Sequence, residues 1–417
     1  MLTEPPMYGA NEIAVDGDPR TDVRYVRITD IDDHGNLRED SWKTAKKIEK
    51  KYALDRNDIL FARTGTVGKT FIHKREDGEA IFAGYLIRFR FDQTRVNPFF
   101  VFYYTLLSRY RLWVRTIQRP SVQPNINSKE FKAFEIPLPP PSIQNHIVTI
   151  MKSAYAEKKQ KEQEADTLLN SIDDYVLTEL GIEIPRQKEN NIENRVFTAT
   201  LSEVSGRRFD PEMYYQVYSL YTKLYPMERF QNCVRINPPT SFSGYAPDTS
   251  ITFVPMKKVS AEYGEADLSL CKMVEETKGY TRFKNNDLIW AKITPCMENG
   301  KSAVVDNLKS GIGCGSTEFY VFRALAGINI RYIHALLRLK SLRKHATLHF
   351  TGSAGQQRVS SEFFKELIIP KPSIEKQAEI ADHITNIRNQ VKQLQQEADA
   401  IVEEAKERVE RILLAEV

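Results

Sequence analysis

The feature that constrains this chain most is an internal repeat with a spacing of about 230 residues. Four segments of the first half recur in the same order in the second half, at offsets of 228, 229, 233 and 231 residues. The pairs are YVRITDI at 25–31 with FVPMKKV at 253–259, DILFAR at 58–63 with DLIWAK at 287–292, FKAFEIP at 131–137 with FKELIIP at 364–370, and PSI at 141–143 with PSI at 372–374. A near-constant offset in a constant order predicts a tandem duplication, in which one unit is built twice.

Each half runs through the same series of local patterns. It begins with short alternating runs rich in aromatic and β-branched residues, such as Ile59–Ala62 and Tyr85–Phe91, which predict β-strands. A helix is expected next, over Phe99–Arg115 in the first half and Ile330–Lys344 in the second. A polar loop and a proline-rich stop, IPLPPPS or IPKPS, then precede a long helix, because proline suits the entry of a helix but not its continuation.

The two long helices are predicted from about Ile143 to Leu180 and from about Ile374 to Ala415. At 1.5 Å per residue, each is on the order of 55–60 Å long. Apolar residues in the second alternate at spacings of three and four, which predicts a coiled-coil seam, whereas the first is patchier. Pairing of the two helices is favoured, and packing of each on its own domain stays open. The predicted seam residues are Ile147, Ile150, Leu168, Ile384, Ile387, Val391, Leu394 and Ile401.

Length and composition exclude several classes of protein. A chain of 417 residues is long enough for about two to four domains and can bury cores without a disulfide framework. Its four cysteines have no C-x-x-C spacing, which argues against structural zinc and fits a reducing cytosol. No apolar run reaches 18 residues, and the first 18 residues lack an apolar core, so neither a transmembrane helix nor a signal peptide is expected. We therefore predict a cytoplasmic protein.

The small net charge of +4 conceals two basic stretches. Residues 88–132 contain nine Arg or Lys and two acids, and residues 320–365 contain eight and one. Each stretch is therefore +7, and the remainder of the chain is −10. Two basic stretches at equivalent places in a repeat are typical of two phosphate-facing surfaces, and a solvated helix face is the alternative for either one alone. The aromatic residues interleaved with the first stretch have helical spacing, which favours a place in the core.

Two loops in each half carry side chains that read base edges or bind phosphates. One loop is rich in amides and hydroxyls, at 118–128 and 351–360; the other is the turn after the strand that begins at Asp58 or Asp287, at 63–69 and 292–301. An ordinary polar loop is the alternative for each. The candidate DNA-binding residues are Arg63, Thr64, Lys69, Arg119, Ser121, Gln123, Asn125, Lys292, Lys301, Ser353, Gln356, Gln357 and Arg358.

Three motifs suggest catalysis but are incomplete. Gly68-Lys69-Thr70 ends like a P-loop, but Arg63 stands where G-x-x-x-x-G-K-T requires glycine. The NPPT sequence at 237–240 resembles the Asn-Pro-Pro-aromatic site of amino-methyltransferases, but Thr240 replaces the aromatic residue that stacks the flipped base. Pro247-Asp248 with Glu276-Thr-Lys278 is too loose a pattern for a nuclease, and the seven histidines lack metal-ligand spacing. We therefore expect no catalytic, cofactor or metal site in this chain.

Four segments carry a resemblance to a known family. They are DILFARTGTVGK at 58–69, IPLPPPSIQ at 136–144, TGSAGQQ at 351–357 and LIIPKPSIEKQ at 367–377. Each is weakly specific, but the doubled set in order resembles the DNA-specificity subunits of type I restriction-modification systems over nearly the whole chain. The resemblance implies an α+β fold: two β-rich target-recognition domains, each followed by a long helix, with the two helices pairing as an antiparallel coiled coil.

The resemblance also implies a division of labour. The first recognition domain would span 1–141, its spacer helix 142–185, the second recognition domain 186–371 and the last helix 372–417. Each domain would read one half of a split, asymmetric duplex DNA sequence, and the chain itself would be non-catalytic. Two DNA methyltransferase subunits would dock on it, and a translocase-endonuclease subunit could join them. S-adenosylmethionine and ATP are expected on those partners.

One departure from the family concerns the start of the first unit. Residues 195–237 form a preface to the second unit that the first lacks, and we expect either a start further upstream or a trimmed first domain. Two other classes of protein stay open: a coiled-coil adaptor whose basic faces bind RNA or protein, and a stand-alone methyltransferase or nuclease. Binding of S-adenosylmethionine distinguishes the enzyme, and salt-dependent retention of duplex DNA distinguishes the adaptor.

Overall fold

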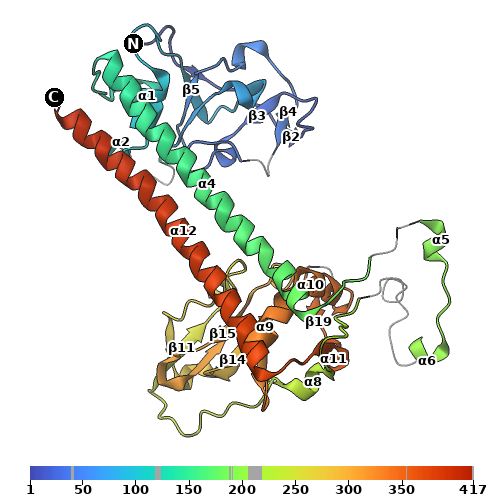
Figure 1. Ribbon diagram of the computed structural model, residues 1–417. Coiled ribbons are helices and arrows are strands. Elements are labelled where there is room, and N and C mark those ends of the chain that lie inside the picture. Colours follow the sequence, from blue (N-terminus) through green and yellow to red (C-terminus); the bar gives the residue numbers. More distant parts are fainter. Residues whose placement is uncertain are drawn as a thin grey trace. The chain divides into compact units, whose positions relative to one another are not determined.

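The structure, a computed structural model, describes residues 1–38, 42–117, 124–186, 189, 191–204, 218–353 and 355–415, with backbone alone at Arg195, Ser202 and Glu203. The chain divides into two compact units, Met1–Gln163 with Leu394–Val417, and Glu164–Gln393 (Figure 1). We call these unit 1 and unit 2. Each long helix is divided between them, and the predicted domain boundaries at 141, 185 and 371 stay predictions.

Unit 1 combines a four-stranded sheet with two strand pairs and short helices. The sheet has the order β1-β8-β5-β6, and β2 pairs with β4 and β3 with β7. The strands are β1 (Met7–Tyr8), β2 (Ala14–Asp16), β3 (Arg24–Val26), β4 (Lys43–Ala45), β5 (Ile59–Ala62), β6 (Thr70–Ile72), β7 (Ala80–Phe82) and β8 (Leu86–Phe89). The helices are the 3-10 turns η1 (Ile28–Asp30), η2 (Lys50–Tyr52) and η3 (Arg75–Asp77), and the α-helices α1 (Pro98–Tyr104), α2 (Ser108–Ile117), α3 (Ser128–Ala133) and the first part of α4 (Pro141–Leu180).

Unit 2 repeats this plan with longer strands. Its sheets have the orders β10-β17-β14-β15 and β12-β11-β16-β13, with the pairs β18-β19 and β20-β9. The strands are β9 (Met227–Arg229), β10 (Val234–Ile236), β11 (Ser250–Val254), β12 (Cys271–Met273), β13 (Thr281–Lys284), β14 (Asp287–Ala291), β15 (Ser302–Val305), β16 (Ile312–Gly315), β17 (Phe319–Ala324), β18 (Phe350–Thr351), β19 (Arg358–Val359) and β20 (Ile368–Pro370). The helices are the last part of α4, α5 (Ile192–Arg195), α6 (Leu201–Val204), α8 (Phe230–Cys233), η4 (Met256–Lys258), η5 (Val274–Thr277), η6 (Lys309–Gly311), α9 (Ile330–Arg338), α10 (Lys340–Thr347), α11 (Ser361–Glu366) and the first part of α12 (Ile374–Ala415).

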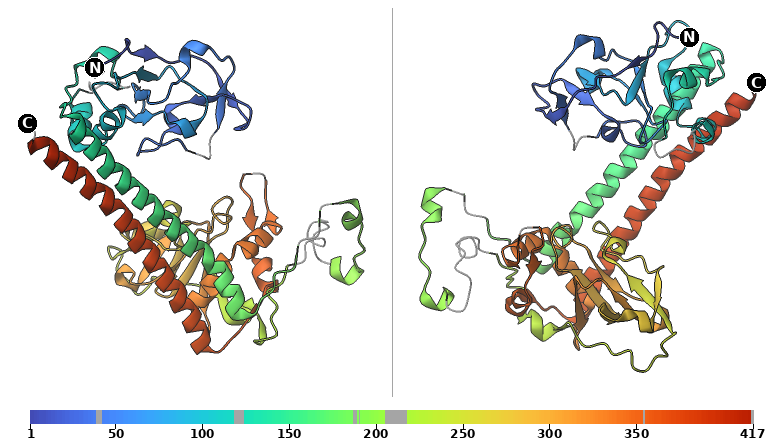
Figure 2. Two further views of the ribbon diagram at one scale, coloured as in Figure 1. Left: turned by 45° about the horizontal axis from the view of Figure 1, so that its top comes forward. Right: turned by 180° about the vertical axis from the view of Figure 1, so that it is seen from behind.

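The strand order confirms the predicted duplication. The sheet β1-β8-β5-β6 of unit 1 corresponds strand by strand to β10-β17-β14-β15 of unit 2, with antiparallel pairing throughout both. The parallel pair β3-β7 likewise corresponds to the parallel pair β11-β16. The helices follow the same order, since α1, α2, α3 and α4 match α9, α10, α11 and α12. Figure 2 shows both units from two further sides, each with its own strands and short helices.

The helix expected after the strands is broken in both units, which corrects the prediction of one continuous helix. Unit 1 has α1 and α2 in place of a single helix over Phe99–Arg115, and unit 2 has α9 and α10 in place of one over Ile330–Lys344. At the breaks, Leu106, Leu107 and Leu339 are buried. A straight amphipathic helix buries apolar side chains along one face only. Because the chain changes direction at the break, the residues of the break also place apolar side chains in the core.

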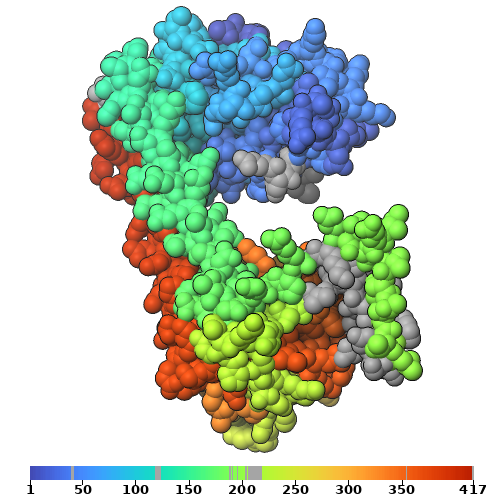
Figure 3. Space-filling view, turned by 45° about the vertical axis from the view of Figure 1, so that its right-hand side comes forward, coloured from blue at the N-terminus to red at the C-terminus, as the bar shows by residue number. Residues whose placement is uncertain are grey.

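The two long helices pair in antiparallel fashion, which confirms the predicted fold class. In unit 1, the ammonium groups of Lys158 and Lys161 on α4 contact Asp399 and Glu397 on α12, at 2.5 and 2.6 Å. In unit 2, Lys376 of α12 contacts Glu179 of α4 at 2.5 Å, so residue numbers rise along one helix as they fall along the other. Figure 3 shows α12, in red, lying along α4, in green.

The buried stripe of α12 departs from the predicted seam in its last third. Ile147, Ile384, Ile387 and Val391 are buried, and Ile150, Leu168, Leu394 and Ile401 are partly buried. After Ala398 the next fully buried position is Val402, a step of four where the heptad pattern predicts three, and burial continues at Ala405, Val409 and Leu413. A step of four in place of three is a stutter, which locally unwinds a coiled coil. No helix in the described residues is long and apolar enough to cross a membrane.

A buried glutamine fixes the entry of each long helix. The side-chain carbonyl of Gln144 accepts from the backbone N–H of Asn97 (2.8 Å), and its amide donates to the carbonyl of Pro139 (2.9 Å). Gln377 makes the corresponding bonds to Asn329 (2.9 Å) and Pro372 (2.9 Å). The two glutamines are 1% and 0% exposed, so each links the proline-rich stop to the N-cap residue of α1 or α9 at a place where water does not compete for the hydrogen bonds.

Candidate functional site

In unit 1 the two candidate loops lie side by side. The loop after β5 places Arg63 against the segment that follows residue 123, where the backbone N–H of Ile126 donates to the carbonyl of Arg63 (2.9 Å). Thr64 and Asn125 form an antiparallel bridge, and Arg63 Nε lies 3.4 Å from the side-chain oxygen of Asn125. The loops predicted separately from sequence therefore form one surface, which we call the loop pair of unit 1 (63–69 with 124–127).

Unit 2 builds the same arrangement with other side chains. The backbone N–H of Val359 donates to the carbonyl of Lys292, and that of Thr294 to the carbonyl of Gln357, each at 3.0 Å. Ile293 and Arg358 form the corresponding antiparallel bridge. We call this surface the loop pair of unit 2 (292–301 with 355–359).

The candidate residues differ in how far they reach solvent. Asn125, Ser353 and Gln356 are exposed. The half-buried candidates on these surfaces are Arg63, Thr64, Lys292, Gln357 and Arg358. Arg119, Ser121 and Gln123 lie outside the described residues.

Each loop pair also holds a cation over an aromatic ring. The guanidinium of Arg63 lies 4.8 Å from the centre of the Tyr8 ring, and the ammonium of Lys292 lies 5.7 Å from that of Tyr320. Arg358 makes two bonds of 2.8 Å to the carboxylate of Glu318, which lowers the pKa of Glu318. These contacts fix the cations near the loop surface, where their remaining N–H groups can still donate.

Two candidate lysines are engaged by their own unit. The ammonium of Lys69 donates to the backbone carbonyl of Ile31 (3.0 Å) and contacts the carboxylate of Asp33 (2.8 Å). The hydrogen bond from Lys69 to Asp33 lowers the pKa of Asp33. Lys301, its counterpart, donates to the carbonyl of Met256 (3.1 Å). Lys69 therefore links the loop after β5 to the turn after β3, and Lys301 links the loop after β14 to the segment after β11. Both lysines stabilise the loops in which they lie.

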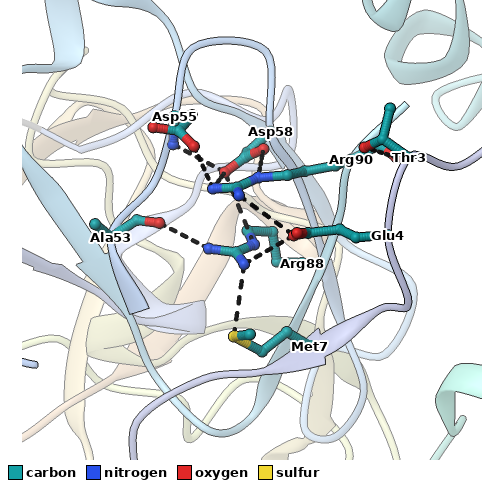
Figure 4. A network of polar contacts seen from close by, with 8 residues as sticks. All are labelled: Thr3, Glu4, Met7, Ala53, Asp55, Asp58, Arg88 and Arg90. Atoms are coloured by element: carbon teal, nitrogen blue, oxygen red, sulfur yellow. Dashed lines mark hydrogen bonds and ion pairs between the residues drawn. The ribbon is translucent and has the colours of Figure 1, made fainter. Parts of the chain in front are cut away.

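The first basic stretch contains arginines that the fold itself uses. Arg90 makes two hydrogen bonds to Asp58, at 2.8 and 3.1 Å, and also contacts Asp55 (2.5 Å). Arg88 is 3% exposed and donates to the carbonyl of Ala53 and to Glu4 (Figure 4). This corrects the expectation that the whole stretch faces phosphate, because Arg88 and Arg90 instead bind carboxylates and a backbone carbonyl of their own unit.

The second stretch is engaged more completely. Arg323 repeats the pairing of Arg90, with two bonds of 2.7 Å to Asp287, which is fully buried. Arg338 donates to the carbonyls of Gly300 (2.6 Å) and Ala261 (2.9 Å), and its burial lowers its pKa to about 9. Arg331, Arg358 and Lys365 pair with Asp306, Glu318 and Glu362. Most basic residues of the second stretch are thus paired with groups of their own unit, and its formal charge of +7 overstates the charge available to contact a polyanion.

The incomplete catalytic motifs have structural places. Asn237 has a φ of 49° and exchanges hydrogen bonds with Val321 of β17, with its backbone N–H donating (2.7 Å) and its side-chain oxygen accepting (3.0 Å). Thr240 accepts from Arg323 (2.9 Å). In the described residues, no group of three or more His, Cys, Asp or Glu is placed to hold a metal ion.

Comparison with known proteins decides the family. The family model described as "Type I restriction modification DNA specificity domain" matches residues 18–170 and again residues 245–403, about three quarters of the chain together. The chain belongs to this family. Each matched range contains one complete loop pair, so the two copies of the specificity domain and the two candidate surfaces coincide.

Individual relatives agree with the family but match only in part. The chain is 36% identical over 180 residues to the type I restriction enzyme EcoAI specificity subunit of Escherichia coli, covering 43% of this chain and 30% of that protein. It is 37% identical over 170 residues to the EcoEI specificity subunit of the same organism, covering 40% and 28%. The matches thus span less than a third of these relatives. A solved structure described as "Structural basis underlying complex assembly and conformational transition of the type I R-M system" shares the fold, with a TM-score of 0.55 and 14% identity over 100% of this chain and 98% of that one.

One exposed residue that the sequence did not indicate as part of the site lies beside the loop pair of unit 1. Tyr85 looks like the first residue of a strand, but β8 begins at Leu86, and Tyr85 is 62% exposed in the preceding turn. The backbone N–H of Arg63 donates to its carbonyl (3.0 Å), so Tyr85 borders the loop pair of unit 1. In unit 2 the corresponding bond runs from the backbone N–H of Lys292 to the carbonyl of Glu318 (2.9 Å), so a charged residue stands at the place of Tyr85.

Proposed function

We propose that this chain is the DNA-reading subunit of a type I restriction-modification complex, with each loop pair reading one half of a split, asymmetric duplex target. The observation that carries the proposal is that the same backbone pairing of two loops, which we call the frame, occurs in both units with different side chains. Arg63, Thr64 and Asn125 occupy the frame in unit 1, and Lys292, Gln357 and Arg358 occupy it in unit 2. Equal frames with unequal hydrogen-bonding groups suit two half-sequences that differ from each other.

The side chains on these surfaces suit readout of base edges. Arginine, asparagine and glutamine make the bidentate contacts that distinguish guanine and adenine in the major groove. Such readers must be held in fixed positions to discriminate, and the strand-like pairing of the two loops supplies a rigid base. Tyr8 beneath Arg63 and Glu318 beside Arg358 restrict those two guanidinium groups further.

The chemistry of the complex would belong to other subunits. We propose that two DNA methyltransferase subunits dock on this chain and bring S-adenosylmethionine, and that a translocase-endonuclease subunit brings ATP. A base-modifying enzyme needs a closed pocket for a flipped base, whereas a reader needs an extended surface along a groove. The proposed chain is therefore non-catalytic and works in the cytoplasm, where its DNA is.

Substitutions in the loop pairs test the reader assignment. We expect Arg63→Ala and Gln357→Ala to weaken binding to cognate duplex by about 5- to 160-fold, which corresponds to the roughly 1–3 kcal/mol of a base contact, and to weaken binding to random duplex far less. The measurement is a pair of titrations, with cognate and random duplex, at one fixed salt concentration. An equal loss on both duplexes would show that these side chains are phosphate contacts and would remove them from the reader.

The same titrations distinguish the adaptor alternative. A DNA-reading subunit must retain duplex DNA at low salt and release it steeply as salt rises. Retention of single-stranded RNA in preference to duplex DNA would favour the adaptor.

A further inference from the structure

A hollow on unit 1 lies between the loop after β5 and helix α2. It has a volume of about 480 Å³. Its floor is the apolar side chains of Val67, Leu106 and Val114, and its rim carries Thr66, Arg111 and Arg115. Within the charged lining, Lys69 and Asp33 neutralise each other at 2.8 Å, so the rim keeps the two guanidinium groups as its net charge.

Arg111 and Arg115 are one helical turn apart and are both exposed. Side chains four residues apart on a helix lie on one face, so both guanidinium groups can reach the same ligand atom group. In the described residues neither arginine has a carboxylate partner within ion-pair distance, in contrast to Arg88, Arg90 and Arg323.

Unit 2 has the corresponding loop and helix, but there the arginines reach into the loop. Arg343 of α10 donates to the backbone carbonyl of Glu298, and Arg338 at the end of α9 donates to that of Gly300. The loop of unit 2 is longer, at 292–301 against 63–69, and one of its carbonyls accepts from Arg343, which stands at the place of Arg111 counted from the start of each helix. Thr347 stands at the place of Arg115. The repeat therefore contains one open copy and one internally satisfied copy of the same place.

We infer that the hollow of unit 1 is a seat for one phosphate group of the DNA backbone, held by Arg111 and Arg115, and that unit 2 has no such seat at the equivalent place. Guanidinium groups bind phosphate oxygens through paired N–H donors, and two of them on one helix face fit a single phosphate. The exposed hydroxyl of Thr66 supplies a further donor at the rim. This inference rests on the proposed function for its choice of DNA as the source of the phosphate.

The test is the salt dependence of duplex binding by the full chain carrying R111Q and R115Q together. One lost phosphate contact lowers the slope of log K against log salt by about 0.9 in magnitude. We expect a fall of about that size for the double variant, similar for cognate and random duplex. Arg109→Gln removes one charge from the same helix outside the hollow and should leave the slope unchanged within error. Because both arginines are exposed, the variants should keep the wild-type unfolding temperature.

An unchanged slope in the double variant, or an equal fall with Arg109→Gln, would overturn the seat while leaving the proposed function in place. A second arm measures the rise in unfolding temperature with inorganic phosphate, in the wild type and in the double variant. If the wild type binds no duplex but gains stability from phosphate through Arg111 and Arg115, the proposed function fails and a free-phosphate site replaces the DNA seat. If neither duplex nor phosphate binding depends on the two arginines, no phosphate seat exists.

Discussion

Two bidentate Arg–carboxylate pairs in unit 2 offer a sharp test of which basic residues serve the fold. Arg323 binds Asp287, which is fully buried, whereas Arg358 binds Glu318, whose side chain is 24% exposed. Replacing Arg323 by methionine keeps a side chain of similar length but leaves the buried carboxylate with one remaining donor, the backbone N–H of Lys284 at 2.9 Å. An uncompensated buried charge costs about 3–5 kcal/mol.

The matched variant is Arg358→Met, in which the carboxylate of Glu318 can turn to water. The loss of a partly exposed pair is expected to cost less than about 1 kcal/mol. For a unit of this size, about 1 kcal/mol corresponds to a shift of roughly 2–4 °C in unfolding temperature. We therefore expect Arg323→Met to lower the unfolding temperature of unit 2 by about 6–20 °C and Arg358→Met by less than about 4 °C.

Scanning calorimetry of the full chain measures both shifts. A third variant, with Arg323→Met and Asp287→Leu together, removes both charges and should regain most of the lost stability, because the cost arises from the unpaired carboxylate. A shift of less than about 4 °C for Arg323→Met, or no recovery in the double variant, would refute the conclusion that Arg323 stabilises the fold by pairing with a buried carboxylate.

Four further outcomes follow from the structure. Burial holds the pKa of His334 well below its usual value, so this side chain stays neutral in the folded state but takes up a proton in the unfolded state below about pH 6.5. The free energy of unfolding should therefore decrease by up to about 1.4 kcal/mol per pH unit below that point. In urea titrations at pH 7 and pH 5.5, His334→Gln should make this decrease smaller. In denaturant titrations, Gln144→Leu and Gln377→Leu should each lower the free energy of unfolding by about 2–4 kcal/mol, and Gln390→Leu at an exposed position should lower it by less than about 0.5 kcal/mol. Comparable losses for all three variants would show that the buried glutamines do not stabilise the helix entries. Tyr85→Ala should reduce the ratio of cognate to random duplex affinity, and an unchanged ratio would place this ring outside the reader. Inserting four residues into both α4 and α12 should change the preferred gap between half-sites, whereas an unchanged gap would mean that these helices do not set it.

The elements that the sequence predicts well are those specified by local signals. The proline-rich stop marks the entry of each long helix, and the predicted ranges lie within two residues of α4 and α12. The seam follows the predicted positions through Val391 and changes step after Ala398, because the helix packs against the core of unit 1 beyond that point.

The contacts that the basic residues make in the fold could not be predicted from the local sequence. Asp58 and Arg90 are 32 residues apart and Asp287 and Arg323 are 36 apart, so charge counting along the chain cannot show that these groups meet. The repeat did indicate these ion pairs, since the acidic and the basic partner recur together in both halves. The breaks between α1 and α2 and between α9 and α10 were missed because the apolar pattern runs through them unbroken.

The most direct test of the central claim, that two equivalent surfaces read two different half-sequences, is modification-sensitive sequencing of DNA from cells that contain this chain and its partner subunits. The expected motif is split and asymmetric, with two unlike halves and a fixed gap of unspecified bases. A chain carrying Gln356→Ala and Gln357→Ala should relax the half read by unit 2 and leave the other half unchanged. A continuous or palindromic motif, or a change in both halves, would contradict the account.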